Sequence, residues 1–336
     1  MSGTPTPCSA GLRRRRRGSA PALLAVAVLA ASCTSSSDEG PRGGGGQGRE
    51  LPFAVDSPWN SPIPEDPDLD GDSGDMVSAL LEDGGAIALL YEYGVPVYEV
   101  DGETPPVDVE CTRTGWGECP LESEPIPVPE GATPSTGSDG AMVVVDEATG
   151  RVYDFWQARP TGSGWEASWG TWADVESDGT GGEAGGSTGG ATGAGVNLLA
   201  GLIRTAEIEE GRIEHALAIV SDNSCPGVYR YPATKTDGHA EDLPCIPQGA
   251  RVQLDPTIDV SAIPGITPGE VSVARALQEY GGYVRDSSEV AMGIAFEVPT
   301  DSDDPYPDVA GFPWDYYDMP HIPWDRLRVL ASWDGS

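Results

Sequence analysis

Lysine is almost absent from the sequence, and basic residues are scarce altogether. Lys235 is the one lysine beside 18 arginines, and these 19 basic residues face 54 acidic residues, which gives a formal net charge of −35. A field of this sign repels phosphate groups over a long range, so it excludes nucleic acid and anionic membrane surfaces as partners.

The sequence also lacks an apolar run long enough for a membrane-spanning helix. Its longest run, Ala20–Ala31, has twelve residues and contains Pro21, whereas a span needs about 20 apolar residues. The run follows five arginines at Arg13–Arg17 and leads into Leu29-Ala30-Ala31-Ser32-Cys33. A basic block, a short apolar stretch and small residues in this order are typical of an exported protein.

This stretch resembles the lipobox of bacterial lipoproteins, although Ala30 stands where leucine is commoner. The resemblance implies cleavage before Cys33, diacylation of Cys33 and a place on the extracytoplasmic side of the cell membrane. Residues 1–32 are then the signal peptide, and residues 33–50 are a flexible Ser- and Gly-rich tether. The alternative is a plain secretory signal with a nearby cysteine. The high Arg, Gly and Pro content points to a GC-rich, actinobacterial genome.

Cysteine is sparse, and no C-x-x-C pair is present. Without Cys8 in the leader and the lipid site Cys33, four cysteines remain, which allow three pairings. The short loops favour two disulfides, Cys111–Cys119 and Cys225–Cys245, as expected outside the cytoplasm. A zinc site is the competing interpretation, but His239 is the only imidazole nearby.

Short alternating segments dominate residues 51–336 and predict a mainly β fold. We expect a single antiparallel β-sandwich or jelly-roll-like domain with a few short helices. The predicted strands are Ala86–Val100 as a bent pair, the hairpin of Ala141–Asp146 and Arg151–Gln157, Trp165–Val175, Ile213–Val220 and Val290–Val298. The predicted helices are Asp75–Glu82, Leu198–Glu210, and one that starts at the Thr267–Glu270 capping box and stops at Gly281.

A glycine-rich insertion interrupts this pattern. Residues 178–195 contain nine glycines in eighteen positions, which predicts a flexible loop that buries no core. No internal repeat accompanies it, so propellers and solenoids are excluded.

A carboxylate within the predicted hairpin is the first catalytic candidate. Asp154 shares a strand face with Val152 and Trp156, where desolvation would raise its pKa. A protonated acid beside an ionised carboxylate is the arrangement that glycoside hydrolysis requires, and Asp139, Asp146 and Asp174 are the candidate partners. The alternative is that this face lies in solvent.

A second candidate set surrounds His215. This residue shares a predicted strand face with apolar neighbours, so it is either a general base or a core histidine hydrogen-bonded to a neighbour. Arg204 and Glu207 lie in the segment that leads into the strand and are expected near its mouth. Tyr153, His215 and an arginine would also suit a polysaccharide lyase. The substrates of lyases are anionic, however, and a chain with this negative charge would repel them.

Aspartates alternate in Asp66-Pro67-Asp68-Leu69-Asp70-Gly71, as at the start of a calcium loop. Asp66, Asp68 and Asp70 are therefore candidate ligands of a structural calcium ion, although Val77 occupies the position of the usual bidentate acid. The alternative is a solvated acidic loop. No other cofactor is expected, because the sequence has no nucleophile elbow, P-loop, dinucleotide fingerprint or HExxH motif.

Aromatic residues are the candidate ligand-binding set. Nine tryptophans are present, and Tyr153, Trp156, Trp169 and Trp172 cluster along neighbouring predicted strands. Exposed indole and phenol rings form flat surfaces on which sugar rings can lie, although large rings equally fill sandwich cores.

Several segments resemble secreted bacterial proteins of an uncharacterised family. They are residues 191–195, 201–204, 211–217, 231–234 and 249–251, within a region from about Asp139 to Asp286. The resemblance implies a shared exported fold and no established activity. The sequence as a whole predicts a lipid-anchored protein that interacts with polysaccharide, with hydrolysis by Asp or Glu as one hypothesis. Non-catalytic binding, adhesion or a structural role in the envelope is the other, and nothing in the sequence indicates an oligomeric state.

Overall fold

The structure is a computed structural model that describes residues 52–82, 84–180, 189–241 and 244–332. The chain divides into two compact units, 1–48 and 49–336, and only the second contains described residues. Cys33, the signal peptide and the tether therefore lie outside the described residues. The fold is mainly β, with 27% strand against 16% helix, as predicted.

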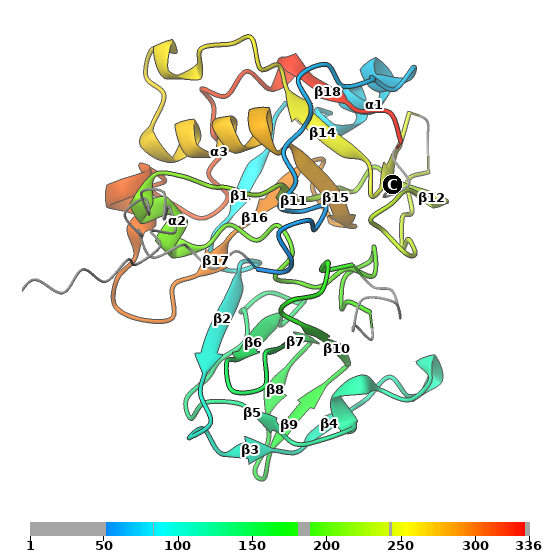
Figure 1. Cartoon of the computed structure of the whole chain (residues 1–336), viewed down its shortest axis with the longest axis vertical. Coiled ribbons are helices and arrows are strands. Elements are labelled where there is room, and N and C mark those ends of the chain that lie inside the picture. The colour runs from blue at the N-terminus through cyan, green and yellow to red at the C-terminus, as the bar shows by residue number, and fades with distance from the viewer. Residues whose placement is uncertain (1–51, 83, 181–188, 242–243, 333–336) are drawn as a thin grey trace, which may run out of the picture. The chain divides into compact units, whose positions relative to one another are not determined.

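A five-stranded sheet contains the predicted hairpin. Its strand order is β10-β7-β6-β2-β17, and Figure 1 shows it in the lower half of the molecule. The confirmed hairpin is the antiparallel pair β6–β7, whereas β2 pairs in parallel with both β6 and β17. The bounds are β2 Val95–Val100, β6 Met142–Asp146, β7 Arg151–Trp156, β10 Trp169–Asp174 and β17 Glu297–Val298.

A six-stranded sheet lies beside it, with the order β1-β16-β11-β15-β14-β18 (Figure 1). This sheet also contains both parallel and antiparallel strand pairs, whereas the sequence predicts antiparallel pairing. The bounds are β1 Ile87–Leu89, β11 Leu217–Val220, β14 Arg251–Leu254, β15 Gly282–Asp286, β16 Gly293–Ala295 and β18 Leu327–Val329.

Three hydrophobic clusters hold these layers together. The first joins the six-stranded sheet to the helices, and the second contains side chains from both large sheets. The third covers the opposite face of the five-stranded sheet together with small sheets. These small sheets are built from β3 Pro106–Val107, β4 Val109–Cys111, β5 Ile126–Pro127, β8 Arg159–Pro160 and β9 Trp165–Ala167, while β12 Ser224–Tyr229 pairs with β13 Ile246–Gln248.

Helices are short, and apolar residues of several of them belong to the hydrophobic cluster of the six-stranded sheet. The longest is α3, Pro268–Glu279, which has the predicted capping box: Glu270 N–H donates to the Thr267 hydroxyl at 3.2 Å. Gly281 follows with φ of 74°, a conformation that glycine adopts freely. The others are α1 Ser73–Leu80, α2 Thr205–Glu210, the 3-10 turns η1 Thr114–Trp116, η2 Pro120–Glu122, η4 Val260–Ala262 and η6 Trp324–Arg326, and the π-helical turn η5 Tyr306–Ala310.

Tertiary contacts shift the predicted helix starts. Helix α1 begins two residues before Asp75, because the Ser73 hydroxyl accepts the Val329 N–H at 2.8 Å and fixes that end to β18. The expected helix over residues 198–210 is confined to α2, Thr205–Glu210.

Two predicted strand segments cross between the sheets. Ala86–Val100 is not a pair of strands bonded to each other, because β1 joins the six-stranded sheet and β2 joins the five-stranded sheet. Val290–Val298 divides in the same way into β16 and β17, and Ala291 to Glu297 are buried rather than half-buried.

Two further strand predictions change in length. The segment Trp165–Val175 divides into β9 and β10 at Ser168. The predicted strand Ile213–Val220 begins only at Leu217, because the Ala216 N–H donates to the Trp59 carbonyl at 2.7 Å instead of to a strand.

The glycine-rich segment is more ordered than its composition predicts. Residues 181–188 lie outside the described part, but Thr192 and Ala194 are buried at 1% exposure each. A Cβ atom on Gly190 would lie 1.8 Å from the Val196 carbonyl oxygen, so only glycine fits there. The expectation that the whole of 178–195 buries no core is wrong for its described C-terminal part.

Within the described ranges, no helix has both the length and the apolar character of a membrane span.

Candidate functional site

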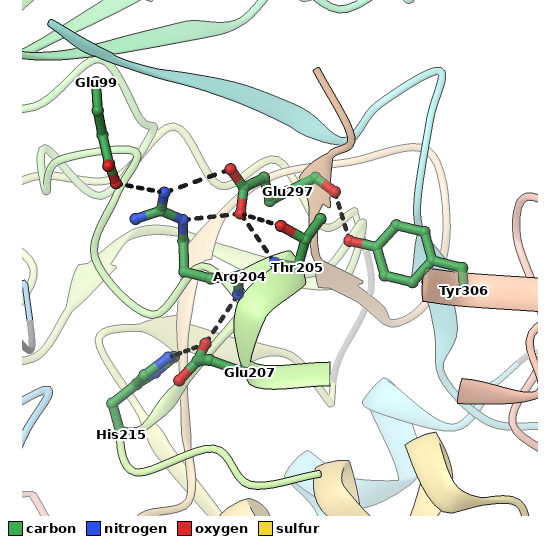
Figure 2. A network of polar contacts seen from close by, with 7 residues as sticks. All are labelled: Glu99, Arg204, Thr205, Glu207, His215, Glu297 and Tyr306. Atoms are coloured by element: carbon green, nitrogen blue, oxygen red, sulfur yellow. Dashed lines mark hydrogen bonds and ion pairs between the residues drawn. The ribbon is translucent and has the colours of Figure 1, made fainter. Parts of the chain in front are cut away.

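Three of the predicted catalytic residues meet in one polar network (Figure 2). The His215 Nε2 lies 2.9 Å from Glu207 Oε2, and that same oxygen accepts the Arg204 N–H at 2.8 Å. His215 and Glu207 are each 1% exposed. Sequence reasoning grouped these residues correctly.

The surroundings of His215 nevertheless match the core interpretation. Its Nδ1 lies 2.9 Å from the Ala216 carbonyl, so both ring nitrogens face oxygen acceptors. Both ring nitrogens are therefore engaged by the protein, and neither is free to exchange a proton with substrate. Burial at this depth also denies substrate access. His215 and Glu207 therefore fix helix α2 to the segment before β11.

Arg204 continues the network towards the five-stranded sheet. Its guanidinium contacts Glu297 at 2.8 Å and Glu99 at 3.0 Å, and Glu297 Oε2 also accepts the Thr205 N–H at 2.9 Å (Figure 2). Burial alone would lower the pKa of Arg204, but the two carboxylates raise it above its ordinary value. The Tyr306 hydroxyl donates to the Glu297 carbonyl, which joins η5 to the same group. The contacts of this network join side chains and backbone groups of the protein itself, which is typical of a structural network.

Asp154 is buried at 0% exposure, because hydrophobic clusters cover both faces of its sheet. Its Oδ1 accepts the Thr171 N–H at 3.2 Å and the Thr171 hydroxyl. Its Oδ2 accepts the N–H groups of Ala191 at 2.9 Å and Leu198 at 3.1 Å. Burial raises the pKa of Asp154, as the sequence predicts, while these four hydrogen bonds lower it. All acceptor sites are occupied by the protein, so Asp154 anchors residues 191–198 to the sheet.

Asp174 does not converge with Asp154. In the register of β10 on β7, Thr171 lies opposite Asp154, whereas Asp174 lies opposite Arg151. The two positions are three residues apart along β10, which means about 10 Å and opposite faces of the sheet. The predicted pairing of these two carboxylates is therefore wrong.

Asp139 belongs instead to a group that we call the acidic cluster: Asp139, Asp237, Asp286 and Glu289. Asp286 is half-buried at the end of β15, and desolvation of its carboxyl group, reinforced by the charge of Asp237, raises its pKa to about 7. Asp139 as a residue is exposed, yet enough protein surrounds its carboxyl group that desolvation raises its pKa as well.

Ser287 connects two members of the acidic cluster. Its N–H donates to Asp286 Oδ1 at 3.0 Å, and its hydroxyl donates to Asp237 Oδ1 at 2.8 Å. Gln248 Nε2 donates to that Asp237 oxygen at 2.6 Å, and the Gly193 N–H donates to Asp286 Oδ1 at 2.9 Å. Ser287 therefore bridges the carboxyl group of Asp286, whose pKa is about 7, and the carboxylate of Asp237, which accepts hydrogen bonds from Ser287 and Gln248.

Aromatic side chains form a surface next to this cluster, which we call the tryptophan platform: Trp116, Trp156 and Trp169 with Arg113. Trp116 is 58% exposed and stacks on Trp156 at 5.8 Å between ring centroids, and it meets Trp169 edge-on at 5.7 Å. Arg113 lies over the rings of Trp116 and Trp156 at 5.5 and 5.4 Å.

A hydrogen bond from Trp156 lowers the pKa of Asp139, against the larger effect of desolvation. The platform and the acidic cluster are thus adjacent.

The two other predicted aromatic residues lie elsewhere. Tyr153 is 3% exposed in the third hydrophobic cluster, where burial raises its pKa, so it is a core residue. Trp172 is half-buried with the Arg151 guanidinium 4.3 Å above its ring.

Both predicted disulfides are present, Cys111–Cys119 and Cys225–Cys245. They fit a secreted, extracytoplasmic protein.

The aspartates of the predicted calcium loop do not converge. Asp70 forms an ion pair with Arg230 at 2.7 Å and accepts the Asp72 N–H at 2.8 Å, contacts that lower its pKa. Asp66 and Asp68 are exposed. Across the described ranges, no group of three or more His, Cys, Asp or Glu side chains could hold a metal ion.

Sequence reasoning missed Trp116 and the Asp237–Asp286 pair. Trp116 stands between Gly115 and Gly117 inside the loop that Cys111–Cys119 closes, and a tryptophan in such a loop is a usable signal for exposure. Asp237 and Asp286 are far apart in sequence, and no local pattern relates them. Comparisons with family models, curated proteins and solved structures find no match to this chain.

Proposed function

We propose that this chain is a lipid-anchored extracytoplasmic protein that binds polysaccharide through the tryptophan platform. The observation that carries the proposal is Trp116, a large apolar ring that is 58% exposed and held rigidly by Trp156 and Trp169. Pre-ordered aromatic rings lose little conformational entropy when a ligand stacks on them.

The platform combines the features that a sugar ring requires. The indole face accepts the C–H face of a pyranose, and nearby polar groups can bind its hydroxyls. Gln157, Ser168 and Asp139 supply such groups, since the Ser168 hydroxyl donates to Gln157 at 2.6 Å and the Trp156 indole bonds to Asp139. The strongly negative net charge favours a neutral polysaccharide over an acidic one.

The anchor is the part of the proposal that rests on sequence. Cys33 would carry the lipid, and the tether 33–50 would hold the folded unit above the membrane. Metabolic labelling with an alkyne fatty acid tests it: we expect label on the wild-type chain and none on Cys33→Ala. Label on both chains, or on neither, would refute the anchor without affecting the binding proposal.

Affinity electrophoresis in gels that contain single polysaccharides tests the binding site. We expect at least one neutral polysaccharide to retard the wild type, and Trp116→Ala to lose most of that retardation. Trp314→Ala is a matched control, because Trp314 is also 58% exposed but contacts Tyr317 instead of the platform. Equal retardation of the two variants would contradict the assignment of the platform.

Hydrolysis is the second candidate, favoured by the geometry of the acidic cluster. Asp286 would act as the general acid, because its pKa of about 7 keeps much of it protonated at neutral pH. Asp237, which accepts hydrogen bonds from Ser287 and Gln248, would be the ionised partner, as general base or nucleophile.

Reducing-end release from each retained polysaccharide tests this candidate. Asp286→Asn and Asp237→Asn should lose at least 100-fold in rate, as removal of a general acid or base commonly does. Asp174→Asn, at the end of β10 in the five-stranded sheet, should retain wild-type activity. If the wild type binds but releases no ends, the protein is a binding module and the acidic cluster has no catalytic role.

A further inference from the structure

A second, basic cavity lies apart from the tryptophan platform and the acidic cluster. It has a volume of about 410 Å³ and is lined by five residues between 61 and 68, residues 230–231 directly after β12, residues 249–251, Tyr283 of β15 and residues 330–332. Arg230 and Arg251 both line it. The chain has 54 acidic residues for its 19 basic ones, so a carboxylate partner could be expected for every arginine. Two arginines that line one cavity without full pairing therefore need an explanation.

Arg251 has no such partner. Its Nε and Nη2 donate to the Tyr280 carbonyl at 2.9 and 2.7 Å, Nη2 also reaches the Ser61 carbonyl, and its guanidinium lies 5.1 Å from the Tyr283 ring centroid. Among the residues that the structure describes, it forms no ion pair with a carboxylate. Burial lowers the pKa of Arg251, which reflects the cost of this uncompensated charge.

Arg230 is only partly satisfied. Its Nη2 contacts Asp70 at 2.7 Å, but its Nη1 is buried and has no hydrogen-bond partner within the described part of the chain. A buried donor without an acceptor destabilises the fold, so a native structure normally supplies an acceptor, from the protein or from a ligand.

The remaining walls define the body of the ligand. They are apolar for the most part, from Pro62, Pro64, Pro67, Ala250 and Leu330, with the Tyr283 ring at the base. Asp68, an exposed carboxylate, is at the rim. The volume is at the small end of the range of about 300–1,000 Å³ that ligand sites occupy.

We propose that this cavity binds a small monocarboxylic acid with a compact apolar body. The carboxylate would pair with the guanidinium groups of Arg230 and Arg251, and the body would contact the proline-rich wall. An inorganic anion would satisfy the arginines but leave that wall unfilled. The proposal is independent of carbohydrate binding, because it uses none of the same residues.

Calorimetric titration of the full chain in a nonionic detergent tests the proposal, with pairs of probes that differ only in charge. The pairs are benzoate and benzamide, cyclohexanecarboxylate and its amide, and 4-hydroxybenzoate and its amide, with inorganic phosphate as a separate arm. We expect at least one carboxylate to bind 10-fold or more tightly than its own amide and than phosphate. Amides that bind as well as their acids, phosphate that binds as well as every acid, or no binding by any acid would each overturn it.

Substitutions locate the site for the acid that binds. Arg230→Gln should weaken binding at least 10-fold, whereas Asp68→Asn should strengthen it severalfold, because a repelling charge at the rim is removed. A gain in affinity cannot result from misfolding. Arg159→Gln, which removes an arginine that is 68% exposed and paired with Glu166, is the matched control and should leave binding unchanged. Unchanged affinity in both Arg230→Gln and Asp68→Asn would place the ligand elsewhere and refute the proposal.

Discussion

Replacement of Asp154 distinguishes a structural anchor from a catalytic acid. In Asp154→Asn, the amide oxygen can replace Oδ2 and accept from Ala191 and Leu198, so that the new NH₂ group occupies the Oδ1 position. There it faces the Thr171 N–H, and two donors then meet without an acceptor. One unsatisfied buried donor costs about 1–3 kcal/mol, and we expect the free energy of unfolding to fall by that amount.

Asp154→Ala should cost more than the asparagine variant. It removes the acceptor of three backbone N–H groups and of the Thr171 hydroxyl, whereas the asparagine variant leaves one donor unsatisfied. At about 1–3 kcal/mol for each buried donor left without an acceptor, the loss amounts to several kcal/mol. That is a large share of the 5–15 kcal/mol typical of a whole protein, so this variant should be close to unfolding at 37 °C.

Urea unfolding of unit 49–336 with intact disulfides measures both changes, and Asp174→Asn serves as the surface control, expected within about 0.5 kcal/mol of wild type. Amide hydrogen exchange adds a local test, because Ala191 and Leu198 should lose protection in Asp154→Ala. An asparagine variant as stable as wild type would refute the anchor. If such a variant also lost hydrolytic activity, Asp154 would be the catalytic acid that the sequence pattern indicates.

Three further predictions concern stability. The pKa of Asp286 is raised to about 7 in the folded chain, from about 3.9 for an ordinary aspartate, so the stabilising contribution of its protonated form is complete below pH 4 and is lost as the pH rises to 7. Wild type should therefore lose stability relative to Asp286→Asn over that range. A parallel pH dependence of the two chains in urea unfolding would be contrary evidence. Conversion of Cys225 and Cys245 to serine opens a loop with a sequence separation of 20 and should lower the free energy of unfolding by about 3 kcal/mol, and a loss below 1 kcal/mol would argue against the loop-entropy estimate. Glu207→Ala leaves the Arg204 N–H without its acceptor and the buried His215 Nε2 without its partner, and it should cost about 1–3 kcal/mol for each group left unsatisfied, while polysaccharide retardation at 4 °C stays unchanged. Loss of retardation by the folded variant would mean that this pair serves binding.

Local signals in the sequence predicted the elements whose partners are close in the chain. The β6–β7 hairpin and the capping box of α3 depend on residues within a few positions of each other, and both are confirmed. The disulfides close short loops and are confirmed for the same reason. Periodicity also placed Asp154 on a strand between apolar neighbours.

What surrounds that strand was beyond the sequence, because distant segments cover it. Periodicity cannot show that the described end of the glycine-rich segment folds back to donate N–H groups to Asp154, or that hydrophobic clusters lie on both sides of the sheet. The alternation of Val290–Val298 indicated one half-buried strand, but that segment passes from one sheet to the other and is buried from Ala291 to Glu297.

In the candidate site too, the sequence predicted contacts between residues close in the chain and missed contacts between distant ones. Arg204, Glu207 and His215 are separated by 11 residues or fewer, and the sequence grouped them, but only the structure shows that all three are engaged within the protein. Asp237 and Asp286 belong to a loop and a strand end that tertiary folding brings to Ser287. The exposure of Trp116 could have been predicted from its place in the loop that Cys111–Cys119 closes, but not from the number of tryptophans alone.

The most direct test of binding by the tryptophan platform uses one oligosaccharide from the polysaccharide that retards the wild type in the gel. Calorimetry compares its dissociation constants for wild type, Trp116→Ala and Trp314→Ala. Removal of a central aromatic contact commonly costs more than 1 kcal/mol of binding free energy, which is at least about fivefold in the dissociation constant. We therefore expect Trp116→Ala to bind at least fivefold more weakly than wild type and Trp314→Ala to bind within twofold of it. Equal affinity of Trp116→Ala and wild type would contradict the claim that the tryptophan platform is the binding site.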